Sequence, residues 1–343
     1  MPAAKVGFFP LDNQLELIER HWSRGLVRQA VWLSGLVAYE QAATILQEIG
    51  QVNISRNSIW RQSQVWGAKL RAMEQAERER ANALPVKWEP PSRSVEPDRR
   101  MGVAMDGTMI HIREDGWKEL KVGTIFEVAV QPIVDERSNE QLERAHAVNN
   151  SYVAHLGGPD MLGELVWTEA RRRRWEQTHD TVAIGDGAPW IWNVVGLHFS
   201  ESQQLVDWYH AKQHLVAAAH CHKGDSPPAY QRWLNSRETM LYQGHAERIA
   251  NELEQTAGEK PDVAEQLRRE AGYFRQNQHR MNYLEMREND WPIGSGMVES
   301  AGKQFKTRFC GPGMRWSRSG AQNLLPIRCA ILSGRFNDLS TTV

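Results

Sequence analysis

The chain has 343 residues, with 41 lysines and arginines against 42 aspartates and glutamates. This length suits two or three domains, and the near-neutral balance excludes an overall basic field for nucleic acid. The three cysteines, Cys221, Cys310 and Cys329, are odd in number and form no C-x-x-C, which argues for a reducing cytosol and against a disulfide framework. No signal-peptide core and no run of about 18 apolar residues is present, so the sequence predicts a cytoplasmic chain without membrane contact.

The N-terminal part has the pattern of amphipathic helices, expected at residues 15–22, 26–37, 39–50 and 55–71. The last two, joined by a short glycine-bearing turn, are typical of a helix-turn-helix. Arg56 and Arg61 lie on the second of these helices, and we assign them to DNA contact. Two ordinary packed helices would give the same pattern, so both interpretations stay open. A proline-rich, charged stretch at 85–100 is predicted to be a linker.

After this linker the texture becomes strand-like. Strands are expected at residues 101–113, 117–130, 146–156, 180–188 and 202–210, with a helix at 159–177. An Asp-Gly pair at Asp115 and Gly116 predicts a tight turn between the first two strands. From Lys212 to about Asp290 the pattern is helical, with mixed charge.

The last predicted helix follows the small residues Gly294, Ser295 and Gly296, and Ser295 is a candidate N-cap. Glu299 falls in its first turn, where the helix dipole favours a carboxylate. The chain from Trp291 onward has seven basic residues, against Glu299 and Asp338 as its acids, which indicates a local anionic partner. The alternative is a solvated face with an ordinary i,i+4 Glu–Lys pair.

Asp106 and Asp186 share a setting in which a hydrophobic strand leads to the acid and then to a glycine. A carboxylate at a buried strand needs hydrogen bonds or a cation to offset its burial. One alternative is that each aspartate simply caps the following turn. Together with Glu299, however, these are three hard oxygen donors, which suit one or two Mg²⁺ ions, with Mn²⁺ as a substitute.

The order of elements and acids is that of ribonuclease-H-like nucleases and DDE transposases. The motifs I-G-D-G-A-P-W-I-W, D-W-Y-H, I-G-S-G-M-V-E-S-A and G-M-R-W, in this order, resemble the ISKra family of bacterial insertion-sequence transposases. The opening G-F-F-P-L-D is similar to the start of a region shared in that family, in which longer members have more sequence before it. The resemblance spans most of the chain, and because the catalytic motifs are complete we expect catalytic competence.

The resemblance implies that Asp106, Asp186 and Glu299 are catalytic and hold the metal. Asp207 and His210, in D-W-Y-H, also match a C/D-x-x-H signature of related transposases. We expect these two residues to orient the catalytic residues without binding the metal themselves. The expected fold is α/β: a ribonuclease-H-like mixed-sheet core interrupted by an all-helical insertion, with a helix-turn-helix-like N-terminal region. The expected segments are a DNA-binding region with linker at 1–98, the core at 99–211 and 291–343, and the insertion at 212–290.

The function that follows from the resemblance is a transposase. It would cut at insertion-sequence ends and join the freed 3′-OH to target DNA by Mg²⁺-dependent phosphoryl transfer. Its partners would be transposon-end DNA and target DNA, bound by a homodimer or larger assembly in the bacterial cytoplasm at the nucleoid. Two alternatives stay open: a catalytically silent end-binding remnant, and a ribonuclease-H-like nuclease without strand transfer.

Several basic and aromatic residues are assigned to DNA. Around Glu299 these are Lys303, Lys306, Arg308, Arg315, Trp316 and Arg318. Trp190 and Trp192 also flank an acid and are candidates for stacking on bases near an unpaired end. The run Arg171–Arg174 cannot lie on one helix face and is expected to be solvated in part.

Four histidines and a cysteine at residues 210–222 raise a zinc alternative. His210 and His214 have the i,i+4 spacing of H-E-x-x-H, but the segment is H-A-K-Q-H and the glutamate base is missing. We therefore favour a polar helix start near the core over a zinc site.

Overall fold

The structure is a computed structural model that describes residues 17, 22–83, 99–134, 141–223, 227–311 and 314–340. The chain folds into two compact units. Unit 1 comprises residues 1–77, 109–118 and 304–343, and unit 2 comprises residues 78–108 and 119–303. The first predicted helical run, the linker and the opening G-F-F-P-L-D lie largely or wholly outside the described residues.

Unit 1 is mainly helical where it is described, and it also includes the end of one strand and the start of the next, at residues 109–118. Its helices are α2 (Arg24–Leu36), α3 (Tyr39–Glu48), most of α4 (Arg56–Ala81), the end of α12 (Gly296–Phe309), α13 (Arg318–Leu332) and α14 (Phe336–Ser340). The hydroxyl of Ser23 caps α2 by accepting from the Leu26 N–H at 3.3 Å. At Gly67, a Cβ would lie 1.9 Å from the Asn323 carbonyl, so the glycine allows α4 to approach the backbone of α13. The helices predicted at 26–37, 39–50 and 55–71 are confirmed.

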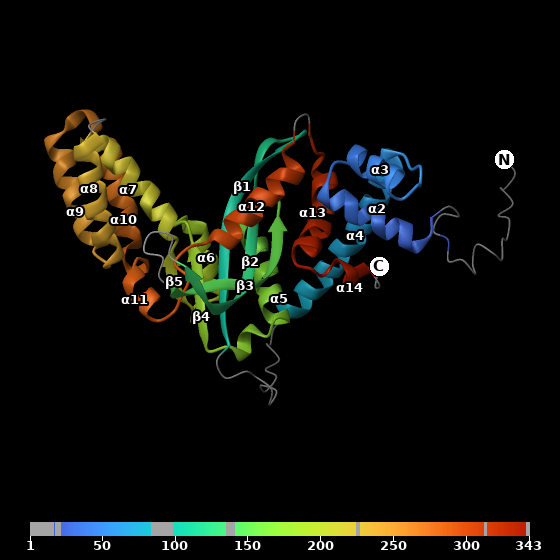
Figure 1. The fold of residues 1–343 in the computed structure, drawn as a ribbon, viewed down its shortest axis with the longest axis horizontal. Helices are drawn as coiled ribbons and strands as arrows, with labels where there is room; N and C mark the ends of the chain where they lie inside the picture. The colour runs from blue at the N-terminus through green and yellow to red at the C-terminus, as the bar shows by residue number, and fades with distance from the viewer. Residues whose placement is uncertain are drawn as a thin grey trace, which may run out of the picture. The chain divides into compact units, whose positions relative to one another are not determined.

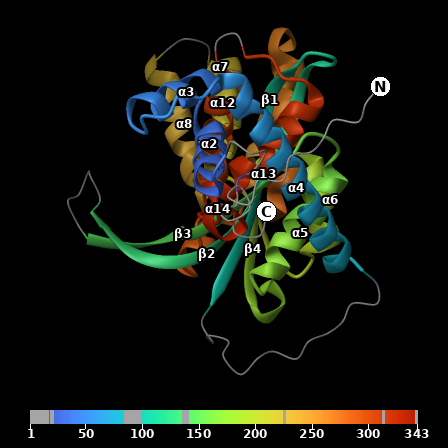
Figure 2. The same cartoon turned by 90° about the vertical axis from the view of Figure 1, so that its right-hand side faces the viewer.

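A five-stranded mixed sheet passes through unit 2 (Figure 1). Its strands are β1 (Arg100–Ile112), β2 (Gly116–Val134), β3 (Gln141–His155), β4 (Asp180–Gly185) and β5 (Gln203–Val206), in the order β3-β2-β1-β4-β5. β1 and β4 are parallel, as are β4 and β5, whereas β2 and β3 are antiparallel. In Figure 2 the far ends of β2 and β3 extend together to one side. The α/β class expected from the sequence is confirmed.

Two helices pack on the sheet. α5 (Pro159–Arg172), followed by the 3-10 turn Trp175–Gln177, packs against β3, and α6 (Pro189–His198) packs against β4 and α5. The sequence did not lead us to expect α6. Its residues are apolar almost throughout, so they lack the polar face that marks an amphipathic helix.

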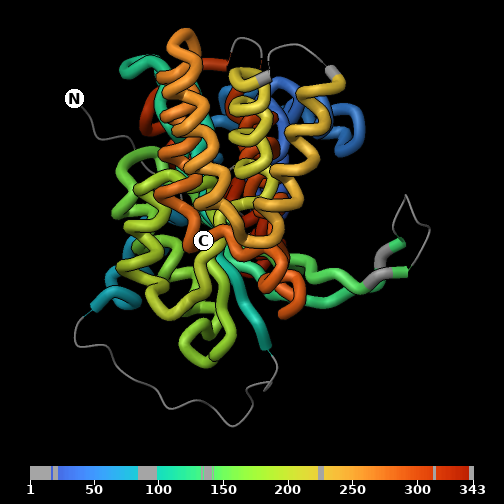
Figure 3. Tube along the Cα trace, turned by 90° about the vertical axis from the view of Figure 1, so that its left-hand side faces the viewer, coloured from blue at the N-terminus to red at the C-terminus, as the bar shows by residue number. Residues whose placement is uncertain are grey.

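A helical bundle follows β5. It consists of α7 (Trp208–Lys223), α8 (Pro227–Tyr242), α9 (Ala246–Glu259) and α10 (Ala264–Asn277), and the short helix α11 (Tyr283–Glu288) leads out of it (Figures 1 and 3). α10 packs against α7 and α9, and α8 packs against α7. The helical stretch predicted from Lys212 is therefore confirmed. The strand predicted at 202–210 is wrong in its second half, because β5 ends at Val206 and α7 begins at Trp208.

A polar network fixes the irregular part of the β2–β3 ladder. The register shifts between Ile125 and Glu127, opposite Asn149, which has a positive φ of 52°. The Arg173 guanidinium donates to the Ile125 carbonyl at 2.6 Å and to Glu127 at 2.9 Å. Arg99 and Asn149 donate to the same carboxylate, at 2.6 and 2.7 Å.

The Arg171–Arg174 run is partly solvated, as expected, because Arg172 and Arg174 are exposed and the other two are half-buried. Three of the four have acidic partners. Arg173 belongs to the network above, Arg171 pairs with Glu176 at 2.7 Å, and Arg172 pairs with the buried Glu169. Their charges are balanced inside the chain, so the run is not a free basic surface.

The Glu127 network gives a prediction about acid stability. Burial alone would raise the pKa of Glu127, but the hydrogen bonds from Asn149, Arg99 and Arg173 hold it at about 2. Because the folded pKa is depressed, the stabilisation is complete above the unfolded pKa of about 4.3 and is lost as pH falls toward 2. Glu127→Gln should lower the free energy of unfolding by about 1–2 kcal/mol at pH 7, since a quarter of the side chain (26 %) stays exposed and screened.

Urea unfolding of Glu127→Gln and wild type at pH 7, 5 and 3 measures this difference, which should shrink toward zero at the lowest pH. Glu176→Gln, which removes a more exposed ion pair (42 %), should stay within about 0.5 kcal/mol of wild type. A pH-independent difference for Glu127→Gln would contradict the electrostatic account.

Candidate active site

Strand register brings Asp106 and Asp186 together. β1 and β4 run parallel, with Ala104 opposite Ile184 as the last registered pair. Two residues further along each strand direction are Asp106 and Asp186. Asp106 lies within β1, which continues to Ile112, whereas Asp186 directly follows the last residue of β4. The two carboxylates therefore come from neighbouring positions on adjacent strands, next to the C-terminal end of β4.

Individual residues explain the conformation of the loop after β4. The Ala188 N–H donates to Asp186 Oδ1 at 2.8 Å, which closes a turn on the aspartate. Gly187 has a φ of 100°, which disfavours any side chain, and Pro189 opens α6 at its first turn. The turn-capping alternative is therefore confirmed for one oxygen of Asp186.

Asp106 has a half-buried side chain whose Oδ1 accepts from the Gly107 N–H at 2.7 Å. Its pKa is raised, chiefly because burial disfavours the charged form. The nearby negative charges of Asp186 and Glu299 raise the pKa further, and His210 opposes them. Asp106 thus lies in the electrostatic field of both other predicted acids. A cation bound among the three would relieve this repulsion.

Glu299 reaches the same place from α12. It lies in the first turn of this helix, as predicted, and Ser295 immediately precedes the helix. The Ser295 carbonyl accepts from the N–H groups of Val298 and Glu299, at 2.9 and 3.1 Å. One turn on, Gly302 is buried, and a Cβ there would lie 3.7 Å from Asp106 Oδ2. Gly302 therefore lies near Asp106, at a distance where a Cβ would make an ordinary van der Waals contact.

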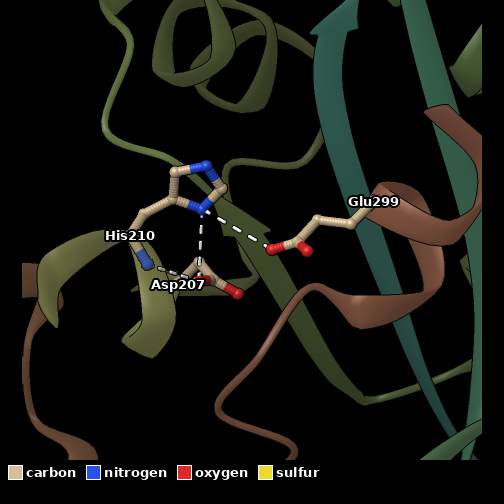
Figure 4. A group of neighbouring side chains, drawn as sticks. All are labelled: Asp207, His210 and Glu299. Atoms are coloured by element: carbon tan, nitrogen blue, oxygen red, sulfur yellow. Dashed lines mark hydrogen bonds and ion pairs between the residues drawn. The ribbon is translucent and has the colours of Figure 1, made fainter. Parts of the chain in front are cut away.

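Asp207 and His210 lie beside Glu299 (Figure 4). Asp207 is fully buried, and its Oδ1 accepts from the His210 backbone N–H at 2.8 Å and lies 3.2 Å from His210 Nδ1. Its Oδ2 accepts from the Ser295 N–H. His210 Nδ1 is also 3.9 Å from Glu299 Oε1. The hydroxyl of the expected N-cap Ser295 hydrogen-bonds Asp207 as well.

The pKa values of this pair follow from that geometry. Burial alone would raise the pKa of Asp207, but the hydrogen bonds from His210 and Ser295 outweigh it, and the pKa is lowered. The Asp207 hydrogen bond in turn raises the pKa of His210, against its own burial. The arrangement favours an anionic Asp207 beside a cationic His210.

Two overlapping sets of residues are candidates for a divalent cation, and among the described residues only the first has its ligand atoms close together. Ligand atoms of Asp207, His210 and Glu299 lie within 4.8 Å of one another. Asp207, however, is fully buried and already uses both oxygens to hold backbone N–H groups. Asp106, Asp186 and Glu299 are half-buried, and each aspartate binds only its own turn through Oδ1. The second set offers the hard oxygen donors that Mg²⁺ prefers, but among the described residues its three carboxylates are not gathered as closely as the first set.

The histidines after His210 have other partners. His214 Nδ1 lies 2.6 Å from the buried Glu270 and its ring stacks on Tyr273, while His220 packs beside Tyr230 and His222 beside Trp233. Within the part of the chain that the structure describes, no group of potential metal ligands includes these three histidines. This arrangement gives no support to the zinc alternative.

The residues assigned to DNA differ in exposure. Lys303, Lys306, Arg315, Arg56 and Arg61 are exposed. Arg318 pairs with Asp115 at 2.6 Å, and Arg56 pairs with Glu40 at 3.0 Å.

Arg308 and Trp316 need correction, because both are buried. Arg308 is 1 % exposed, donates to the Ser34 carbonyl at 2.7 Å and lies over the rings of Tyr39 and Trp316. Burial lowers its pKa to about 10. Trp316 donates its indole N–H to the Phe309 carbonyl at 2.9 Å. In this structure both residues pack unit 1 internally and present no surface to DNA.

Trp192 also does not fit a stacking role. It is 9 % exposed and lies under the Arg280 guanidinium, 4.3 Å from the ring centroid. Trp190 is half-buried, with Lys121 over its ring.

One contact to the predicted acids had no sequence signal. Tyr273, on α10, donates its hydroxyl to the Asp186 carbonyl at 2.9 Å. A Cβ at Gly187 would lie 2.8 Å from the same ring. The helical bundle thus supports the loop of Asp186, through a tyrosine 87 residues away in sequence.

The chain belongs to the family described as "Uncharacterised protein family (UPF0236)", whose model matches residues 6–339. Nearly the whole chain is covered, including every predicted acid. That description gives no activity, so the transposase assignment stays a prediction. A search of curated proteins found no match. None of the described helices is long and apolar enough to cross a membrane.

The buried Asp207 gives a prediction about stability. Asp207→Asn keeps the shape but replaces an accepting oxygen with an NH₂ group, so an N–H of Ser295 or His210 loses its partner. The variant should lose about 2–4 kcal/mol of unfolding free energy in urea at pH 7. Asp180→Asn, at the exposed start of β4, should change it by less than about 0.5 kcal/mol. Equal stability of the two variants would show that Asp207 does not hold this region together.

Proposed function

We propose that the protein is a DDE transposase that cuts DNA at insertion-sequence ends and joins the freed 3′-OH to target DNA. One observation carries the proposal: Asp106 in β1 lies within the electrostatic influence of Asp186, in the loop after β4, and of Glu299, in the first turn of α12. The three residues are far apart in sequence, so a local structure such as a shared turn does not explain why they lie near one another.

The topology supports the same proposal. The order β3-β2-β1-β4-β5, with β1, β4 and β5 parallel, agrees with the ribonuclease-H-like core expected from the sequence. The helical bundle enters after β5 and returns before α12, where the motif comparison with ISKra transposases predicts an insertion. The membership in an otherwise undescribed family is compatible with this assignment and does not by itself favour it.

The chemistry is in-line displacement at phosphorus. In the first step a water oxygen bonds to the phosphorus, and the bond to the 3′ oxygen breaks, leaving a 3′-OH and a 5′-phosphate. In the second step that 3′-OH bonds to a target phosphorus, and a target 3′ oxygen leaves. Asp106, Asp186 and Glu299 would hold one or two Mg²⁺ ions, which supply charge stabilisation at the entering and leaving oxygens.

The chain's own residues have three tasks in this scheme. The three carboxylates position the reacting groups, and the Asp207–His210 pair fixes the start of α7 beside Glu299. Lys303 and Lys306 are exposed basic residues on α12, the helix that also contains Glu299, and they bind the phosphate backbone of DNA. Because two DNA ends must be joined to one target, we propose a homodimer or larger assembly on DNA, in the bacterial cytoplasm.

The acids give the direct test of this proposal. Asp106→Asn, Asp186→Asn and Glu299→Gln should each reduce Mg²⁺-dependent cleavage and strand transfer at least about 1,000-fold, because each removes a metal ligand. Binding to labelled end DNA should change little. The assay uses full-length protein, labelled transposon-end DNA and a target plasmid.

Asp180→Asn is the matched control, since it neutralises an exposed acid at the other end of β4, and it should cleave like wild type. Chelation should stop the reaction, and Mg²⁺ or Mn²⁺ should restore it. Near-normal cleavage by any triad variant would remove that residue from the site, while cleavage without joining would favour the nuclease alternative.

The lysines of α12 give a separate prediction for DNA binding. Each neutralised phosphate contributes about −0.9 to the log–log salt slope of duplex binding. Lys303→Ala and Lys306→Ala should each weaken binding to all sequences alike and flatten this slope by about one unit. Lys118→Ala, an exposed lysine outside the assigned set, is the control and should keep the wild-type slope. Unchanged slopes in both α12 variants would contradict a DNA-facing role for this helix.

A further inference from the structure

Unit 2 contains a cavity beside the carboxylates that the catalytic scheme does not use. Its volume is about 830 Å³, within the usual range of about 300–1,000 Å³ for ligand pockets. It is lined by one stretch of β3, the start of α7, the ends of α8 and α11, and the segment that leads into α12. These elements come from distant parts of the sequence, so the cavity exists only in the folded unit.

Aromatic rings form one side of the cavity. Trp208 and Tyr242 meet edge to face with their centroids 5.7 Å apart, and Tyr209 lies next to Trp208 in the chain. Tyr209 is 61 % exposed, which is unusual for a large ring in a described helix. An exposed ring that lines a cavity is a platform on which a flat, unpaired base can stack.

Two arginines give the cavity a positive charge. Arg144 and Arg287 both line it, with Glu143 as the acid among the lining residues. The pKa of Arg287 is lowered, first by burial and then by the positive charge of Arg144. Arg287 makes no ion pair with any residue in the described ranges. A bound anion would relieve both the burial and the repulsion between the two cations.

The cavity wall also contains unsatisfied polar atoms. His146 Nε2 and Asn150 Oδ1 are buried and have no hydrogen-bond partner among the described residues. Buried polar atoms are nearly always hydrogen-bonded, so a polar ligand or water is expected near them.

The cavity shares a wall with the candidate active site. Tyr209 stands between Asp207 and His210 in the chain, and the Trp208 N–H donates to the Ile293 carbonyl at 2.9 Å. A Cβ at Gly294 would lie 3.1 Å from the Tyr209 ring and 3.7 Å from Asp207 Oδ2. A nucleotide in the cavity would therefore lie next to the residues that hold Glu299.

We propose that this cavity binds an unpaired nucleotide of the DNA substrate, with its base on Tyr209 and its phosphate facing Arg144 and Arg287. This inference rests on the proposed function, because it places the nucleotide beside the phosphate to be cut. The exposed ring and the two cations match the base and the phosphate of a nucleotide. A stacked ring alone or a cationic patch alone would not specify that ligand.

Fluorescence quenching tests the proposal without requiring cleavage. The probe is a single-stranded thymidine 12-mer with one central 2-aminopurine, titrated with full-length protein in EDTA. Stacking on Tyr209 should quench the fluorescence, and Tyr209→Ala should weaken binding roughly 5- to 150-fold. Tyr209→Phe, which keeps the ring, should bind like wild type. Arg287→Gln should weaken binding, and Arg287→Lys should restore part of it.

Trp117→Ala is the matched control, because Trp117 is 62 % exposed and does not line the cavity. It should bind like wild type. A 5-iodouracil in place of the 2-aminopurine should crosslink to Tyr209 or Trp208 on irradiation, which locates the base independently of any variant. A fully paired duplex should show no quenching, and adenosine monophosphate should compete only if the cavity takes free nucleotides as well.

Wild-type binding and quenching in Tyr209→Ala would overturn the proposal, as would crosslinks that map outside the cavity. The result is separate from the proposed function. If quenching depends on Tyr209 but the protein never cuts DNA, the nucleotide site stands and the transposase assignment is refuted. If Tyr209→Ala cuts DNA normally and binds the probe like wild type, the nucleotide site is refuted and the transposase assignment stands.

Discussion

The candidate site depends on one buried carboxylate, Asp207, which is fully enclosed and yet ionised. Its N–H donates to the Gly185 carbonyl at 2.7 Å, so it is attached to the end of β4 next to Asp186. Its two oxygens hold the start of α7 and the segment before α12. Burial of this charge is tolerated because several N–H and O–H groups compensate it. Without that compensation, the approach of Glu299 to the two aspartates would not be fixed.

The consequence is a site assembled from four separate segments around a shared polar centre. Parallel pairing of β1 and β4 places the aspartates, and the Asp207 bonds place the glutamate helix. Tyr273 adds a contact from the helical bundle to the Asp186 carbonyl. The helical bundle therefore helps to hold Asp186 in place, because a change in α10 would alter the position of the loop that contains Asp186. Gly187 makes this contact possible, because a Cβ there would lie 2.8 Å from the Tyr273 ring.

Local pattern was sufficient for much of this fold. Alternating and apolar runs predicted β1, β2, β3 and β4, and the strand-acid-glycine pattern singled out the two aspartates that register later placed side by side. The N-terminal helices and the helical insertion also followed from periodicity. The class and most of the elements could thus be predicted, because each rests on residues close in sequence.

What could not be predicted depends on tertiary context. β5 is short because Asp207 begins a helix, and D-W-Y-H is as compatible with a strand as with a helix start. Arg308 belongs to a basic segment, and only the packing of unit 1 shows that it is buried under two aromatic rings. α13 contains Pro326 in its interior, which argues against a helix locally. Arg287 and Tyr209 lie in different helices, and no spacing connects them.

The most direct test of the central claim is the position of the metal. Crystals of the full-length protein grown with Mn²⁺ would reveal it in an anomalous difference map. The account predicts one or two peaks bound by carboxylate oxygens of Asp106, Asp186 and Glu299, with Asp207 still bonded to Ser295. A peak bound by Asp207 and His210 without the two other aspartates would contradict it, and so would Mn²⁺ that binds elsewhere in the chain.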